Sequence, residues 1–282
     1  MKSSFLPLIF LLSLVCLSSC RTEFETIRAS GDTKLLYSKA NEFYEAEEWL
    51  KAQTLYELII GSYRGKKEAE QIYFRYAYTH FHIKKYILAS YYFKNFANTF
   101  ATSEYREESD FMSAYANYKM SPTYRLDQSH TTKAIDEFQL FVNTYPSSER
   151  VSECNRIMDE IRIKLEQKAF AEAELYYNLK QYQSAMRSFE NLLKEYPDTK
   201  NEEKIRFLML KTSYLFASNS FLDKQEDRFR TTVDHYKTFK SKFARSSYRK
   251  EVNNIYKDST KKLKDLGNDR YKNKSTGFRS KL

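Results

Sequence analysis

The sequence contains few side chains that could act as catalysts or metal ligands, and their spacing is not that of a catalytic site. His80 and His82 lie two positions apart in a helical pattern, so their imidazoles point to different faces and make a poor pair of metal ligands. His80 falls where a packing residue is expected, which predicts a core or boundary histidine. Neighbouring acids such as Glu107 and Glu108 are typical of a solvated helix face.

Known catalytic motifs are missing from the sequence. It contains no Gly-rich phosphate loop, no Gly-x-Ser-x-Gly element and no His-Glu-x-x-His element. We therefore predict no enzyme activity, no metal site and no cofactor. A hydrolase with a helical body is the competing class, and it would need a cluster of catalytic residues that the sequence does not display.

One thiol has a defined chemical context near the amino terminus. Lys2 precedes an apolar stretch from Phe5 to Cys16, and the run Leu17-Ser18-Ser19-Cys20 follows it. An apolar stretch this short is typical of a secretory signal and not of a membrane span. The run resembles a bacterial lipobox, whose cysteine becomes the first residue of the mature protein and carries a diacylglycerol on sulfur and an acyl chain on nitrogen.

This resemblance predicts a lipoprotein signal peptide over residues 1–19, a covalent N-acyl diacylglycerol on Cys20 and a lipidated tether over residues 20–33. Several acyl chains on one residue give stable membrane anchoring. The alternative is an ordinary signal peptide with a chance cysteine. Cys154 then has no intrachain partner, and its helical spacing with Ile157 and Ile161 predicts a small buried hydrophobe and not a reactive thiol.

Composition favours an all-helical chain with an uneven charge. The chain has 24 Tyr and 21 Phe but only 5 Gly and 4 Pro, so helix breakers are scarce. Residues 237–282 hold 15 Lys/Arg and 4 Asp/Glu, a local charge of +11 in a chain of net charge +10. This basic segment is predicted to contact an acidic partner surface or anionic lipid headgroups, or else to be a solvated, solubilising face. Export argues against nucleic acid as a partner.

A small residue followed four positions later by an aromatic recurs along the body. The pairs are Ala52–Tyr56, Ala89–Phe93, Ala134–Phe138, Ala185–Phe189 and Thr232–Tyr236. Positions four apart share a helix face, where a small residue admits a neighbouring helix and the aromatic fills the adjacent space. A second small residue precedes each pair, at Ala40, Ala77, Ala116, Ala173 and Ser213. This spacing predicts a series of helix–turn–helix units.

These units resemble the tetratricopeptide repeat, and Pro146 and Pro197 match its closing proline. The predicted fold is all-α, a solenoid of about five helical hairpins that bury their apolar faces against neighbours. We predict an N-terminal half over residues 34–147 with repeats one to three. A C-terminal half over 148–246 would contain a long connector helix and repeats four and five. Residues 247–282 would form a basic amphipathic helix capped at Gly267, with a disordered tail from Asn268.

An insertion in the third repeat points to a particular family. The run Ser121-Pro122-Thr123-Tyr124-Arg125-Leu126-Asp127-Gln128 precedes Ala134, and together with the lipobox and the repeats it resembles the BamD family of outer-membrane assembly lipoproteins. The resemblance implies a periplasm-facing lipoprotein anchored in outer-membrane lipid. Its implied partners are an Omp85-type barrel assembly subunit, bound through its periplasmic domains, and unfolded β-barrel precursors. The alternative is another tetratricopeptide lipoprotein scaffold, for example one for pilus secretin assembly.

The first helices of repeats one and two present an unusual number of rings on the face opposite their packing residues. We predict a peptide-binding groove there, because an extended peptide ending in an aromatic residue would find stacking surface and hydrogen bonds. The competing interpretation is that the longer repeats bury these rings between helices. The predicted groove residues are Tyr37, Asn41, Tyr44, Phe74, Tyr78 and Phe81.

Overall fold

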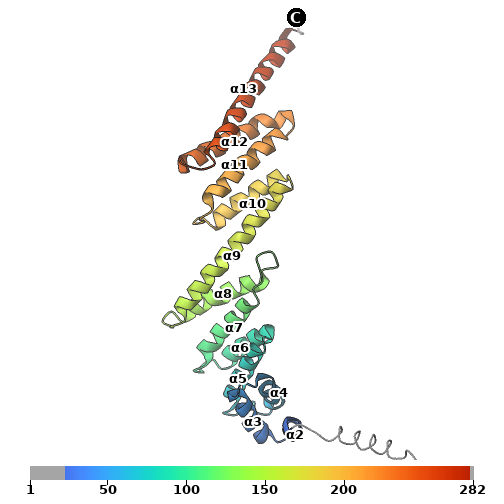
Figure 1. Cartoon of the computed structure of the whole chain (residues 1–282), viewed down its shortest axis with the longest axis vertical. Helices are drawn as coiled ribbons and strands as arrows, with labels where there is room; N and C mark the ends of the chain where they lie inside the picture. The colour runs from blue at the N-terminus through green and yellow to red at the C-terminus, as the bar shows by residue number, and fades with distance from the viewer. Residues whose placement is uncertain (1–22, 280–282) are drawn as a thin grey trace, which may run out of the picture. The chain divides into compact units, whose positions relative to one another are not determined.

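The computed structural model describes the backbone of residues 23–279 and the side chains of residues 23–268 (Figure 1). The predicted signal peptide and Cys20 lie outside the described residues. All the regular secondary structure in the described residues is helical, as predicted. Its helices are α2 (Glu23–Ala29), α3 (Thr33–Glu45), α4 (Trp49–Ile59), α5 (Ala69–His82), α6 (Tyr86–Thr99), α7 (Arg106–Lys119), α8 (Ser129–Thr144), α9 (Val151–Asn178), α10 (Tyr182–Glu195), α11 (Glu202–Ser218), α12 (Leu222–Lys242) and α13 (Arg249–Arg279).

The chain forms two compact units that divide between Ile161 and Arg162, inside α9. In unit 1, each helix from α3 to α8 packs against the next one along the chain. In unit 2, α10 to α13 do the same, and α13 also contacts α11. Contacts that run from each helical hairpin to the next define a repeat solenoid in each unit, which confirms the predicted fold class. None of the described helices is both long and apolar enough to cross a membrane.

The small and aromatic residues that repeat in the sequence form the cores of both units. All five pairs and all five preceding small residues are buried. The fifth repeat replaces two alanines by hydroxyl residues, and Ser213 and Thr232 hydrogen-bond each other at 2.9 Å. This bond satisfies two hydroxyls that would otherwise be buried without partners. The repeat pattern therefore holds even where its residue types are weakest.

The turns inside three hairpins share one backbone conformation. Glu47, Lys84 and Lys180 have φ of 58°, 62° and 60°, in the left-handed region that non-glycine residues seldom adopt. After each of them the next residue donates its N–H back to the helix, as Lys85 does to the His80 carbonyl at 2.9 Å. This closure matches a Schellman-type helix end. The same turn therefore ends α3, α5 and α9 and leads into α4, α6 and α10.

Helix α9 has 28 residues, which corresponds to a length of about 42 Å at 1.5 Å per residue. Its first turns bury Cys154, Ile157 and Ile161 in unit 1. Its later turns pack Ala173 into the core of unit 2. Its length agrees with the long connector helix expected from the sequence.

Two segments differ from the sequence predictions. Part of the predicted tether is helix α2, where Ile27 is buried and Phe24 meets Phe43 edge to face at 5.7 Å. At the other end, α13 continues through Gly267 to Arg279. Gly267 is therefore not the C-cap that the sequence predicted, since no proline follows to interrupt the helix. The disordered tail from Asn268 stays a prediction.

Candidate functional site

The predicted groove residues lie on α3 and α5, the first helices of repeats one and two, and we call this surface the helix-A face. All six are half-buried. Contacts 34 positions apart join the two helices: the Tyr37 hydroxyl donates to Gln71 at 2.6 Å, and Arg75 donates to Asn41 at 3.3 Å. These bonds hold α3 against α5, so the structure places the two predicted groups of residues on adjoining helices.

Arg75 lies at the centre of this face, and sequence reasoning missed it. Its Nη2 pairs with Glu45 at 2.8 Å, and its guanidinium carbon lies 4.7 Å from the Tyr44 ring centroid. Asn41 also accepts the Tyr56 hydroxyl at 2.7 Å. Burial raises the pKa of Tyr44, while the positive charge of Arg75 opposes that rise. No spacing in the sequence singles out Arg75, which directly follows the predicted Phe74.

A shallow open hollow of about 760 Å³ adjoins α3. Glu45 lines it, and its side chain is 67% exposed, whereas that of Arg75 is only 20% exposed. The hollow therefore combines one ring, one amide and a carboxylate that holds a partly buried arginine. Its full lining is Tyr37, Ser38, Asn41, Glu42, Glu45 and Ala46.

The rings contributed by α5 pack more deeply. Phe74 stacks on Tyr105 at 4.5 Å between centroids and also meets Phe96 at 5.5 Å. Phe81 lies 5.9 Å from Tyr115 of the following repeat. These three contacts join α5 to α6 and to the region of α7, as the competing interpretation of the rings required.

Tyr78 belongs to a polar bridge between repeats. Its hydroxyl donates to Glu108, which also pairs with Arg150. Burial, and then the hydrogen bond to Glu108, raises the pKa of Tyr78 well above its usual range. Of the six predicted residues, only Tyr37 and Asn41 line the hollow. Tyr37 also packs against the Tyr63 ring at 5.4 Å, and the other four contact neighbouring rings or charges without lining the hollow.

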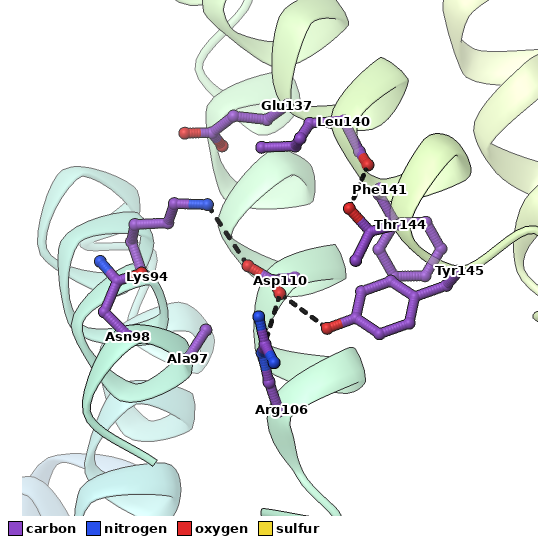
Figure 2. A pocket seen from close by; sticks show the side chains of 10 residues that line it. All are labelled: Lys94, Ala97, Asn98, Arg106, Asp110, Glu137, Leu140, Phe141, Thr144 and Tyr145. Atoms are coloured by element: carbon purple, nitrogen blue, oxygen red, sulfur yellow. Dashed lines mark hydrogen bonds and ion pairs between the residues drawn. The ribbon is translucent and has the colours of Figure 1, made fainter. Parts of the chain in front are cut away.

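A second, narrower pocket of about 210 Å³ lies among α6, α7 and α8 (Figure 2). Figure 2 shows Asp110 at its centre, paired with Lys94 at 3.3 Å and Arg106 at 3.9 Å and accepting the Tyr145 hydroxyl at 2.9 Å. Burial, and then this hydrogen bond, raises the pKa of Tyr145 to about 12. The two cations share one carboxylate. Because Lys94 lies on α6 and Asp110 on α7, this cluster joins repeats two and three.

The inserted run of the third repeat is an ordered loop held by its last residue. Gln128 is buried; its Nε2 donates to the carbonyls of Thr123 at 2.9 Å and Leu126 at 3.0 Å, and its Oε1 accepts from Thr131 at 2.8 Å. The Leu126 side chain at the tip is exposed. The hydrogen bonds of Gln128 therefore hold the loop so that the apolar Leu126 side chain faces solvent.

The remaining titratable groups fit structural positions. His80 is buried with neither ring nitrogen hydrogen-bonded, which agrees with the predicted core histidine. Cys154 is fully buried as predicted, and burial raises the pKa of its thiol to about 11. Within residues 23–268, no group of three or more His, Cys, Asp or Glu side chains is arranged to hold a metal ion.

Comparison with known proteins gives a match for most of the chain. Residues 29–226 match the YfiO family model, described as an outer membrane lipoprotein. A search of the curated proteins found no match. Among solved structures, the TPR2AB domain of yeast Sti1 in its complex with pHSP90 aligns with 81% of this chain and 98% of that chain, at 11% identity and a TM-score of 0.37.

Proposed function

Because this chain belongs to the YfiO family of outer membrane lipoproteins, we propose that it is a BamD-type scaffold of the machinery that assembles β-barrel proteins in the outer membrane. In this role it is anchored by acylated Cys20, faces the periplasm, binds an Omp85-type barrel subunit and receives unfolded barrel precursors. It acts by adhesion, without catalysing a reaction.

The observation that carries precursor docking is the hollow beside α3 together with Arg75. Glu45 holds Arg75 from a position that is 67% exposed, although Arg75 itself is only 20% exposed, so water can solvate the Glu45 carboxylate once it is displaced. A peptide carboxylate can therefore replace that of Glu45 on the guanidinium at small cost, with charge-assisted hydrogen bonds of the same kind.

The rest of the hollow suits an extended chain end. The Tyr37 ring offers stacking surface to a terminal aromatic side chain, and the Asn41 amide offers hydrogen bonds to peptide groups. Glu42 at the rim disfavours additional negative charge. We therefore propose that the preferred ligand is an extended peptide with one carboxylate, at its C-terminus, next to an aromatic residue.

The class of partner is tested by capture from solubilised outer membranes with the acylated chain as bait. Recovery of an Omp85-type barrel protein supports the proposal. Recovery of a secretin without the barrel subunit would replace it with the alternative scaffold function.

Peptide docking is tested with a synthetic peptide that ends in Phe, as a free acid and as a C-terminal amide. We expect the free acid to bind wild type roughly tenfold or more tightly than the amide, since a hydrogen bond to a charged group contributes about 1.5–3 kcal/mol. Arg75→Gln should erase this preference, whereas equal binding of acid and amide by wild type would refute the role of Arg75.

A second variant tests the hollow without touching the arginine. Ser38→Trp places a bulky ring in the hollow at an exposed position, and Ser62→Trp adds the same ring at an exposed position in the segment between α4 and α5. Only Ser38→Trp should weaken peptide binding. Circular dichroism of both variants checks that helical content is kept.

A further inference from the structure

The turn between α11 and α12 carries the most exposed pair of large apolar side chains among the described residues. Phe221 is 86% exposed and Leu222 is 72% exposed. The turn has a fixed conformation, because Gln225 donates to the Ser220 carbonyl at 2.9 Å and Arg228 donates to the Ser220 hydroxyl. Exposing two adjacent large hydrophobes on an ordered turn has no benefit for folding and marks an interaction site.

Helix α13 runs antiparallel to α12, toward this turn. Tyr256 stacks on Tyr236 at 4.1 Å, and further along Lys262 lies 5.9 Å from the Phe229 ring centroid. From Phe229 back to Leu222 is about 10 Å along α12, so the residues of α13 beyond Lys262 approach the level of the turn. Figure 1 shows α13 passing α12 and continuing beyond the other helices of unit 2.

The outer face of α13 is positively charged. Lys257, Lys261 and Lys264 are exposed, and within the described part of the chain none of them forms an ion pair. Two acids of the same helix are engaged elsewhere: Glu251 pairs with Lys211 at 2.9 Å, and Asp258 accepts the Tyr214 hydroxyl at 2.8 Å. Asp265 is exposed and offsets part of the charge. The lysines therefore leave a positive potential on the part of α13 that lies near the level of Phe229, about 10 Å along α12 from the apolar turn.

We propose that the α11–α12 turn and the lysines of α13 form a second membrane contact, with Phe221 and Leu222 entering an anionic bilayer surface and Lys261 and Lys264 facing its phosphates. Exposed apolar side chains beside basic ones are the combination that binds the interface of anionic membranes. This contact is separate from the acyl anchor and from peptide docking on unit 1.

A bilayer explains the shape of this surface better than an acidic protein does. The apolar pair projects from a turn. A protein partner would need a matching pocket to bury such a side chain, whereas the acyl chains of a bilayer can surround it at any position. Long lysine side chains also reach phosphates without fixed geometry. At the neighbouring α9–α10 turn of the same unit, Leu179 is exposed beside exposed Lys180. Turns or helix starts in unit 1 expose apolar side chains in the same way, at Leu50, Ile87 and Leu126.

The test uses the full acylated chain in vesicles, with an environment-sensitive dye on a Leu222→Cys variant. Buried Cys154 is shielded from the label. We expect the dye emission to shift to the blue in vesicles that contain phosphatidylglycerol and to stay near its aqueous value in phosphatidylcholine alone. Ile163→Cys is the matched control, because Ile163 is 67% exposed on α9 and lies sixteen positions from Leu179. The emission of a dye at this position should stay near its aqueous value in both kinds of vesicle.

Charge is tested by Lys261→Glu with Lys264→Glu, against Lys200→Glu with Lys240→Glu, an equal charge change at exposed positions away from the turn. The α13 pair should reduce the population of chains whose α11–α12 turn is inserted in the anionic membrane roughly tenfold or more, since each basic residue near an anionic surface contributes about a fivefold factor. The control pair should leave it nearly unchanged. Three results with the dye on Leu222→Cys would overturn the proposal. They are no shift of its emission in anionic vesicles, an equal shift in both kinds of vesicle, and a shift only when poly-L-glutamate is added.

Discussion

Replacing His80 by leucine should change how unit 1 responds to acid. The imidazole is 2% exposed and lies against Tyr76 at 4.6 Å and Tyr92 at 5.0 Å between ring centroids. Neither of its nitrogens has a hydrogen-bond partner. Burial, and then the positive charge of Lys85, lowers the pKa of His80 from 6.5 to about 4, while Glu57 opposes that change.

The sign of the effect follows from proton binding. Between pH 6.5 and 4 the unfolded chain binds a proton at this histidine and the folded chain does not, so stability falls as the pH falls. A difference of about 2.5 pKa units corresponds to roughly 3 kcal/mol, at about 1.4 kcal/mol per unit. The loss begins near pH 6.5 and levels off below pH 4, where both states become protonated.

The leucine variant lacks this titration. Near pH 7.5 it gains about 1–3 kcal/mol by removing buried polar atoms without partners, and it loses about 0.5–1.5 kcal/mol of ring–ring interaction. We therefore expect the variant to be about 1 kcal/mol more stable than wild type at pH 7.5. This advantage should grow by roughly 3 kcal/mol between pH 7.5 and pH 4.

Urea unfolding followed by Trp49 fluorescence measures this effect. Trp49 is the single tryptophan of the chain and lies in unit 1, stacked on His82 at 3.9 Å. Burial also lowers the pKa of His82, but its contribution is common to wild type and variant and cancels in the difference. The exposed His130→Leu variant is the control. Equal losses of stability in wild type and His80→Leu between pH 6.5 and 4 would refute the reasoning.

Two further substitutions test the turns. Lys84→Gly should stabilise unit 1 by about 0.5–1 kcal/mol in urea unfolding, because φ of 62° costs a non-glycine residue energy that glycine avoids; a destabilised variant would show that the Lys84 side chain has a role. Gln128→Ala should destabilise unit 1 by about 1–3 kcal/mol, since Thr123, Leu126 and Thr131 lose their partner, and should speed amide exchange in residues 121–128. Unchanged exchange would mean that the loop is held by other contacts.

The sequence alone determined the repeat and its core. A small residue and an aromatic four positions apart lie on the same face of one helix, so the sequence alone shows which face packs. Ala89 and Phe93 are buried as that spacing predicts. The burial of His80 and Cys154 followed from the same periodicity. Helix α9 could be predicted because its apolar spacing continues without a break.

Only the tertiary structure decided which side chains remain available for partners. Tyr37 and Phe74 occupy equivalent places in the sequence pattern, yet Tyr37 lines an open hollow whereas Phe74 packs between α6 and Tyr105. Arg75 joins the site through Glu45 and Asn41 on the preceding repeat. Helix periodicity reports which face of one helix is buried, but exposure depends on which neighbour covers the other face. That neighbour comes from another part of the chain, so its position follows from packing and not from the local sequence.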